Sequence, residues 1–280
     1  MEIKRDIFKE LLSHSAEDEI TLLVGARQVG KTTVMNQLAS HIEKQGQECI
    51  LFTLEDKKIL SFLNDDPKNL ISLIPPLHDE KKLTIIIDEI QYLDDPSNFL
   101  KLIFDLYKDK IKLMVTGSSA FYIDRKFKDS LAGRKRIFNL MTLTFEEMLR
   151  FRGYDKFAQY LNQGHFPLLY KSELEVLLYE YCLFGGYPAV VLAKTAEKKK
   201  LILKEIAESY IKKDVIDSNL ELFDIYLQMM QLLANQTGSL VNVRQISNTL
   251  NINVETVRKY LYTMQKSFHL TRIKPYWTNK

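Results

Sequence analysis

The most constraining feature of this sequence is the eight-residue segment GARQVGKT at positions 25–32. It fits the phosphate-binding loop pattern G-x-x-x-x-G-K-[ST] (the P-loop, or Walker A motif) at every specified position. Gly25 and Gly30 let the backbone wrap closely around a phosphate, Lys31 supplies a positive charge, and Thr32 offers a hydroxyl to a magnesium ion. Such a loop needs a strand before it and a helix after it, so the motif predicts local structure as well as a ligand.

Both flanks of the loop have the required patterns. Residues 19–24 form a short apolar run that is typical of a strand buried on both faces. In residues 33–42, Val34, Leu38 and Ile42 recur at helical spacing. The backbone N–H groups at that helix N-terminus would point toward an anion. The predicted nucleotide-binding residues are therefore Gly25, Gln28, Val29, Gly30, Lys31, Thr32 and Thr33.

Alternating strands and helices continue after the loop. The remaining predicted strands cover residues 48–54, 83–87, 111–115 and 136–140, and a helix is expected over 97–107. This alternation predicts an α/β fold with a parallel sheet of about five strands, helices on both faces and right-handed crossovers. A nucleotide would then bind at the carboxyl ends of the strands.

Helical periodicity replaces this alternation from residue 144 onward. Phe145, Met148 and Leu149 begin an apolar stripe, and Thr144 with Glu147 forms the sequence pattern of a capping box. The predicted organisation is a P-loop domain over residues 1–143, an all-helical lid over 144–236 and a winged-helix or helix-turn-helix segment over 237–280.

The last segment reads as two short helices, 243–250 and 254–262, around a tight turn. Asn242 and Asn253 are the expected N-caps. The predicted small core consists of Ile246, Leu250, Ile252, Val257 and Leu261. Residues 268–275 resemble the first strand of a wing, yet no second strand follows. We therefore expect a fragment truncated within a winged helix; the alternative is a natural terminus without the second wing strand.

Two carboxylates close the third predicted strand, in Ile85-Ile-Ile-Asp-Glu89. This pattern resembles a Walker B motif. Asp88 is expected to hold magnesium beside Thr32, and Glu89 to orient or deprotonate a water that attacks the γ-phosphate. The pattern thus predicts hydrolysis in addition to binding. The alternative is a charged strand end in a surface loop.

Further candidate residues lie on other connections. Ser118, in Thr116-Gly-Ser-Ser119, follows the fourth strand, where a hydroxyl could contact the γ-phosphate; a helix-capping turn is the alternative. Arg134 precedes the fifth strand and is a candidate arginine finger for a neighbouring subunit, or part of a solvated basic loop. Two other cations, Arg27 inside the loop and Arg5 before it, could contact the nucleotide, but surface roles are expected for both.

Five motifs occur together in one order along the chain: GARQVGKT at 25–32, IDEIQ at 87–91, TGSS at 116–119, LAGR at 131–134 leading into LTFEE at 143–147, and GGYP at 185–188. The chain resembles prokaryotic AAA+ ATPases in which an AAA domain, a helical lid and a winged helix precede a nuclease-like C-terminal domain of unknown function. This resemblance implies an additional-strand P-loop fold, ATP and Mg²⁺ as ligands, ATP-dependent conformational switching and assembly into a homo-oligomer. It implies no particular substrate.

Composition and cysteine spacing restrict the cellular location of the protein more than its function. The chain has 39 basic and 36 acidic residues and a formal charge of +3, which neither requires nor excludes nucleic acid. No apolar run reaches membrane-spanning length. Cys49 and Cys182 lie far apart and outside any C-x-x-C pair, which argues against a disulfide framework or a thiolate metal site. We therefore expect a cytoplasmic protein.

Three functions remain in competition. The leading hypothesis is an ATP-hydrolysing switch. The second is a DNA-binding protein for which ATP is a regulator, with Thr256, Lys259 and Tyr262 facing outward on the last helix. The third is a P-loop kinase, which the Asp88-Glu89 pair disfavours. A GTPase is weaker still, because no Asn-Lys-x-Asp segment follows the fourth strand.

Overall fold

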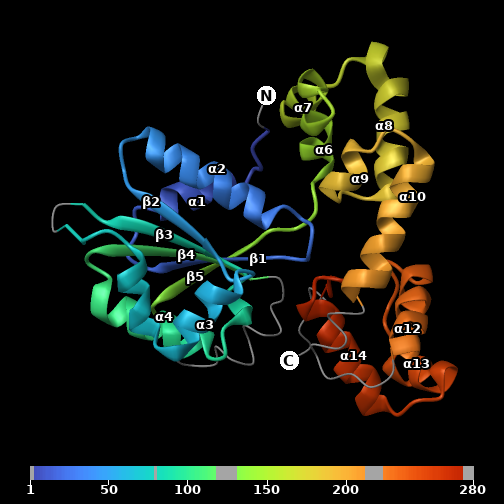
Figure 1. Ribbon diagram of the computed structural model, residues 1–280. Helices are drawn as coiled ribbons and strands as arrows, with labels where there is room; N and C mark the ends of the chain where they lie inside the picture. The colour runs from blue at the N-terminus through green and yellow to red at the C-terminus, as the bar shows by residue number, and fades with distance from the viewer. Residues whose placement is uncertain (1–2, 79–80, 118–130, 212–222, 274–280) are drawn as a thin grey trace, which may run out of the picture. The chain divides into compact units, whose positions relative to one another are not determined.

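The computed structural model describes residues 3–78, 81–117, 131–211 and 223–273. The chain divides into two compact units, Met1–Leu203 and Lys204–Lys280, and each is described by itself (Figure 1). No helix within these described ranges is both long enough and apolar enough to cross a membrane.

The first unit is built on a five-stranded sheet with the order β2-β3-β4-β1-β5. All four pairs of neighbouring strands are parallel. The strands are β1 (Ile20–Val24), β2 (Cys49–Thr53), β3 (Leu83–Asp88), β4 (Ile111–Gly117) and β5 (Lys135–Asn139). The predicted α/β fold with a parallel sheet of five strands is confirmed.

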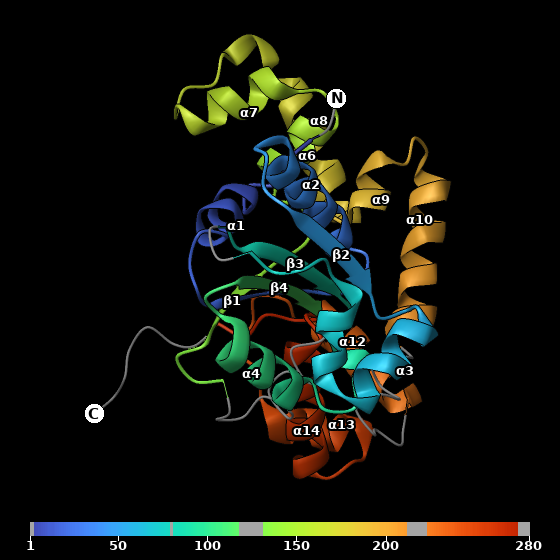
Figure 2. The same cartoon turned by 60° about the vertical axis from the view of Figure 1, so that its left-hand side comes forward.

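The burial of the strands explains why their apolar runs could be recognised in the sequence. The three inner strands, β1, β3 and β4, are buried over their whole length, whereas the edge strands β2 and β5 are partly exposed. A parallel sheet is covered on both faces, so its inner strands are apolar without alternation. Helices α1 (Phe8–His14) and α2 (Lys31–Lys44) cover one face, and α3 (Lys57–Asp65) and α4 (Pro96–Tyr107) cover the other (Figures 1 and 2). Two 3₁₀ turns, η1 (Pro67–Leu73) and η2 (Ile90–Tyr92), complete this layer.

A helical segment follows the sheet within the same unit. Its elements are α6 (Phe145–Phe151), α7 (Asp155–Asn162), η3 (Leu168–Tyr170), α8 (Lys171–Phe184), α9 (Pro188–Leu192) and α10 (Ala196–Glu205). The predicted capping box at the start of α6 is confirmed: the Glu147 N–H donates to Thr144 Oγ1 at 3.1 Å, and the Thr144 N–H donates to Glu147 Oε2 at 3.0 Å. Leu143, Met148, Leu149 and Leu177 pack together in the core of this segment.

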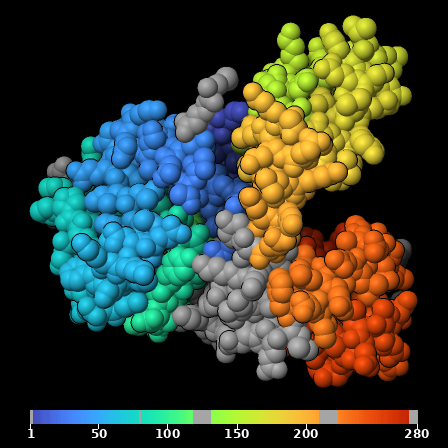
Figure 3. Space-filling view, turned by 45° about the vertical axis from the view of Figure 1, so that its right-hand side comes forward, coloured from blue at the N-terminus to red at the C-terminus, as the bar shows by residue number. Residues whose placement is uncertain are grey.

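The second unit contains the π-helical turn η4 (Ile206–Ile211) and the helices α12 (Phe223–Asn235), α13 (Val243–Leu250) and α14 (Val254–Lys266). The expected caps at Asn242 and Asn253 are confirmed, since each side chain accepts backbone N–H groups of the helix that follows. Ile246 and Val257 are fully buried, and Leu250, Ile252 and Leu261 pack against them. Two helices joined by a short turn are therefore present at the predicted positions, while their assignment to a helix-turn-helix domain stays a prediction. Figure 3 shows α12 to α14, in orange to red, as one compact body.

Helix α12 shares the core of α13 and α14, where Tyr226 and Met229 are fully buried. The expected lid boundary after residue 236 would separate α12 from the helices on which it packs. The apolar stripe of α12 resembles that of a lid helix, so the sequence alone did not show that α12 packs against α13 and α14. The division into three domains stays a prediction.

The expected wing strand beginning at Phe268 was wrong for the residues that the structure describes, 268–273, which form no strand. Phe268 has a left-handed backbone with φ 61°, incompatible with an extended strand. The N–H groups of Phe268, His269 and Leu270 donate to carbonyls in the last turn of α14. Since these N–H groups close a helix, they are unavailable to a sheet ladder. The rest of the expected strand lies outside the described residues.

Candidate nucleotide-binding site

The P-loop connects β1 to α2, and its geometry requires both motif glycines. Gly30 is the N-cap of α2 with φ 97°, a left-handed conformation that glycine adopts at little cost. A Cβ atom on Gly25 would lie 2.2 Å from the carbonyl oxygen of Leu140, so only glycine fits against this backbone. Gly25 thus permits a close approach to the segment after β5, a contact that the motif alone does not predict.

Lys31 lies inside the loop and is only 4% exposed. Its Nζ donates hydrogen bonds to the carbonyl oxygens of Gly25 and Ala26, each at 3.0 Å. The ammonium group is therefore held within the loop by the loop's own backbone. Hydrogen bonds from a charged donor are stronger than neutral ones, so the contacts also stiffen the loop.

The ends of β3 and β4 bring three oxygen-bearing side chains together beside the loop. Thr32 Oγ1 donates to Asp88 Oδ2 at 2.7 Å, and Thr116 Oγ1 donates to Asp88 Oδ1. Thr116 Oγ1 also accepts the backbone N–H of Glu89 at 3.1 Å. Because β3 and β4 are parallel neighbours, their carboxyl ends meet at the same edge of the sheet. Asp88 is thus oriented by one hydroxyl from the loop and one from β4.

Glu89 follows Asp88 in a left-handed backbone conformation, with φ 60° and ψ 48°. This conformation is uncommon for residues other than glycine, and such residues cluster at functional sites. The Glu89 carboxylate accepts a hydrogen bond from the Gln91 side-chain amide. Backbone and side chain are therefore both held in a defined orientation.

The pairing of Thr32 with Asp88 fits a magnesium site. Mg²⁺ prefers oxygen ligands, takes few of them from the protein and leaves the others to water and substrate phosphates. A hydroxyl and a carboxylate oxygen 2.7 Å apart, at the end of a P-loop, are a matching donor set. Thr32 and Asp88 are the residues that would hold the ion.

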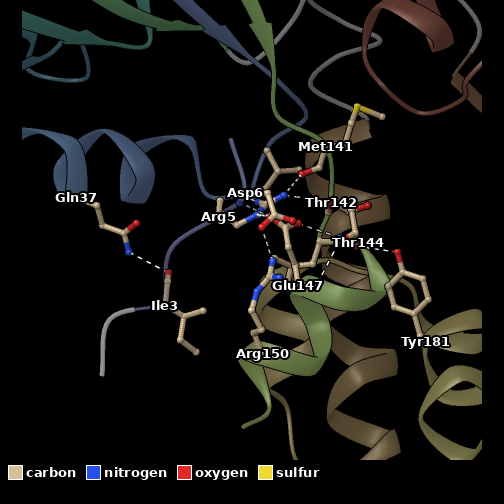
Figure 4. A network of polar contacts seen from close by, with 12 residues as sticks. Ile3, Arg5, Asp6, Gln37, Met141, Thr142, Thr144, Glu147, Arg150 and Tyr181 are labelled. Atoms are coloured by element: carbon tan, nitrogen blue, oxygen red, sulfur yellow. Dashed lines mark hydrogen bonds and ion pairs between the residues drawn. The ribbon is translucent and has the colours of Figure 1, made fainter. Parts of the chain in front are cut away.

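Arg5 connects the loop to the helical segment, and the expectation that it lies at the surface was wrong (Figure 4). It is 7% exposed, and its guanidinium donates to Glu147 Oε1 at 2.8 Å, Val29 O at 2.9 Å and Met141 O at 2.8 Å. A charged group is buried only when it has such partners. The sequence offered no local signal, because these partners lie 24, 136 and 142 residues away.

Glu147 is 3% exposed and ionised in this arrangement. Burial is the largest single influence on its pKa and raises it, but hydrogen bonds from Arg5, the Asp6 N–H and the Thr144 N–H together outweigh burial. The pKa of Glu147 therefore lies below its ordinary value. The carboxylate is both the capping-box partner of Thr144 and the counter-ion of Arg5.

The GGYP motif contacts the segment between β5 and α6 through Gly186. The Leu143 N–H donates to Gly186 O at 2.7 Å, and Tyr181 Oη donates to Leu143 O at 2.7 Å. A Cβ atom on Gly186 would lie 2.1 Å from Leu143 O, so this position admits only glycine. The linker after β5 is thus held by the P-loop at Leu140 and by α8 and Gly186 at Leu143.

The remaining predicted site residues are Arg134, Ser118, Gln28 and Thr33. Arg134 stands at the amino end of β5, where its guanidinium binds the Asp105 carboxylate at 2.7 and 3.3 Å. Since the strands are parallel, that end is the edge opposite the P-loop, and a role toward a neighbouring subunit stays a prediction. Ser118 lies outside the described residues. Gln28, with φ 63°, and Thr33 are exposed on the loop and the first turn of α2.

A parallel sheet of this strand order, with a P-loop after β1 and acidic residues at the carboxyl end of β3, defines a P-loop NTPase fold with a nucleotide-binding site. Residues 17–149 match the family model described as "AAA domain", and residues 175–280 match a domain of unknown function, DUF8612. Residues 17–149 of the first unit are thus similar to an AAA domain.

Two curated relatives are similar over almost the whole chain. The uncharacterized protein MJ1544 of Methanocaldococcus jannaschii is 26% identical over 95% of this chain and 57% of its own length. An uncharacterized protein of Haemophilus influenzae is 26% identical over 98% of this chain and 66% of its own length. The chain thus spans roughly three fifths of the length of these two relatives.

Among solved structures, the ORC2 protein of Aeropyrum pernix, determined as ADPNP–ADP complexes, is similar with a TM-score of 0.48 and 14% identity. The similarity covers 96% of this chain and 84% of that chain.

Proposed function

We propose that this chain binds ATP with Mg²⁺ and hydrolyses it, acting as an AAA+ conformational switch. The observation that carries this proposal is the set of contacts joining Thr32, Asp88, Thr116 and Glu89 beside the loop that contains Lys31. Binding of a nucleotide alone would not require an oriented carboxylate next to the proposed magnesium ligand. ATP as the nucleotide is inferred from the AAA-type domain.

Each residue has a distinct role in the proposed reaction. The backbone N–H groups of Gly25, Gln28, Val29, Gly30 and Thr33 and the Lys31 ammonium bind the phosphates. Thr32 and Asp88 hold the metal, which when bound would neutralise phosphate charge. Glu89 orients the attacking water and accepts its proton, while Gln91 fixes the position of the carboxylate. Ser118 is proposed to contact the γ-phosphate, and Arg134 to serve a neighbouring subunit in a homo-oligomer.

Replacing Glu89 separates hydrolysis from binding. In Glu89→Gln the side chain keeps its shape but loses its basicity, so nucleotide binding should persist while turnover falls by about 10²-fold or more. Binding of a fluorescent ATP analogue and release of phosphate are measured in parallel. Glu43→Gln, at an exposed position late in α2, is the control and should match the wild type. Wild-type turnover by Glu89→Gln would refute the assignment of the base, and absence of ATP binding by the wild type would refute the proposal as a whole.

The same experiment distinguishes hydrolysis from a kinase reaction. A hydrolase releases phosphate in buffer without any other acceptor. A kinase of the same fold would bind ATP but release almost no phosphate until an acceptor is supplied. Negligible phosphate release by a wild-type protein that binds ATP well would therefore favour the kinase.

The exposed face of α14 supports a second function, binding to DNA. Lys259 and Tyr262 are exposed, as is Arg258, while Thr256 is half-buried. Cations and an aromatic ring on the second helix of a helix-turn-helix suit contacts with the DNA backbone. A gel shift with duplex DNA at low and high salt tests this, using a Lys259→Ala, Tyr262→Ala double variant. Absence of binding at low salt would exclude the function, because phosphate contacts are strongest there.

A further inference from the structure

Arg5 uses all three of its guanidinium nitrogens on three separate parts of the first unit (Figure 4). Nη1 binds the P-loop at Val29 O, Nη2 binds the linker at Met141 O and Thr142 O, and Nε binds α6 at Glu147 Oε1. The segment that carries Arg5 is itself fixed to α2, because the Gln37 side-chain amide donates to Ile3 O at 3.2 Å. A planar guanidinium with a fixed set of donors is suited to hold three groups in one geometry.

The bond to Val29 O controls the orientation of a peptide group inside the phosphate loop. A peptide unit is planar and trans, so its C=O and the next N–H point in opposite directions. When Arg5 holds the Val29 carbonyl at 2.9 Å, the Gly30 N–H must point away from Arg5. Gly30 is left-handed, with φ 97°, and glycine resists rotation of this peptide less than any other residue. A rotated peptide would present a carbonyl oxygen, which repels phosphate.

The bond to Glu147 extends this control to the helical segment. Glu147 Oε1 also accepts the Asp6 N–H at 2.9 Å, and Oε2 accepts the Thr144 N–H that begins α6. The P-loop peptide and the first turn of α6 are therefore joined through two side chains. A change of geometry at either end must be accommodated by the same guanidinium.

We propose that Arg5 is a positioning residue of the phosphate site: it keeps the Val29–Gly30 peptide in the orientation that binds phosphate and ties that peptide to the start of α6. This inference rests on the proposed function, since it presumes that the loop binds nucleotide. It assigns a role to a residue that belongs to none of the recognised motifs of the chain.

The test must separate this role from simple stabilisation by a buried ion pair. Arg5→Met alone leaves the Glu147 carboxylate buried without its counter-ion, which destabilises any protein. The double variant Arg5→Met, Glu147→Gln removes both charges and keeps similar volumes. Arg152→Met is the matched control, because Arg152 donates to Glu180 at 2.6 Å within the helical segment, away from the loop. The dissociation constant of a fluorescent ADP analogue, in the presence of Mg²⁺, and the melting temperature are measured for the wild type and the three variants.

We expect the double variant to recover most of the melting temperature that Arg5→Met loses, yet to bind nucleotide about tenfold to a hundredfold more weakly than the wild type, since a hydrogen bond from a charged donor is missing. Arg152→Met should bind as the wild type does. Wild-type affinity in the double variant would overturn the inference and leave the proposed function intact. Failure of the wild type itself to bind nucleotide would overturn both.

Discussion

Thr32 Oγ1 donates a 2.7 Å hydrogen bond to Asp88 Oδ2, joining residues that are 56 positions apart in the sequence. This bond connects the P-loop to the carboxyl end of β3, and Thr116 supplies a second hydroxyl to the same carboxylate from β4. Asp88 is thereby fixed before any ligand arrives. Preorganised groups cost little reorganisation when a charged substrate binds.

Lys31→Ala should strongly weaken nucleotide binding. The ammonium of Lys31 is the only charge that the P-loop motif itself places on the phosphates, and we expect affinity to fall by at least about tenfold to a hundredfold. Calorimetric titration with ATP and Mg²⁺ measures this. Lys44→Ala, an exposed lysine at the end of the same helix, is the control. ATP binding and turnover at the wild-type level in Lys31→Ala would contradict the proposed function.

Thr116→Val should reduce turnover while Thr116→Ser preserves it. Valine matches the shape of threonine but neither donates to Asp88 nor accepts the part-buried Glu89 N–H, and the buried Asp88 carboxylate loses one hydrogen bond at a cost of about 1–3 kcal/mol. We expect a turnover rate lower by about tenfold or more, measured as phosphate release at saturating ATP. Equal rates for the valine and serine variants would show that the hydroxyl has no role in orienting the site.

Gly186→Ala should destabilise the first unit. The new Cβ would lie 2.1 Å from Leu143 O, a backbone atom that cannot move without breaking its bond from Tyr181. Overpacking of this kind costs about 1–3 kcal/mol, which urea unfolding resolves. Leu192→Ala, at an exposed position at the end of α9, should change stability by less than about 0.5 kcal/mol. A Gly186→Ala variant as stable as the wild type would mean that the linker is not held as tightly as the contacts indicate.

Stability should rise with pH in the alkaline range because of Lys112 on β4. Burial, opposed by Glu17 and Glu19, lowers the pKa of the Lys112 ammonium from 10.5 to about 8. Between these values the folded protein has released the proton while the unfolded chain still holds it, so the free energy of unfolding increases as pH rises. Below about pH 8 both states are protonated and this contribution is constant. Urea unfolding between pH 7 and 10.5 should show the rise in the wild type and lose it in Lys112→Met.

The exposed Lys101→Met variant on α4 is the control for Lys112 and should keep the rise. An unchanged pH profile in Lys112→Met would mean that other groups cause it. Lys112 is 2% exposed, and its Nζ donates hydrogen bonds to the carbonyl oxygens of Glu17 at 2.7 Å and Glu19 at 2.5 Å.

Most of the sheet was predictable because its signals are local. Each of the five strands lies within about two residues of the predicted range, since an inner parallel strand must be continuously apolar. The Thr144–Glu147 capping box and the caps at Asn242 and Asn253 depend on residues two or three positions apart. The wing strand failed because its residues also suit a helix terminus, and the N–H groups were already used to close α14.

The phosphate loop, the acidic strand end and the succession of strands and helices along the chain could be predicted from the sequence, because each is encoded by neighbouring residues. Three relationships became visible only in the folded chain. Arg5 is buried between Val29 and Glu147, Gly25 and Gly186 pack against the two ends of one linker, and Arg134 lies at the edge of the sheet opposite the P-loop. These relationships join residues distant in sequence. They arise from how strands and helices pack against one another, and the periodic pattern that marks each element does not show which distant residues will meet.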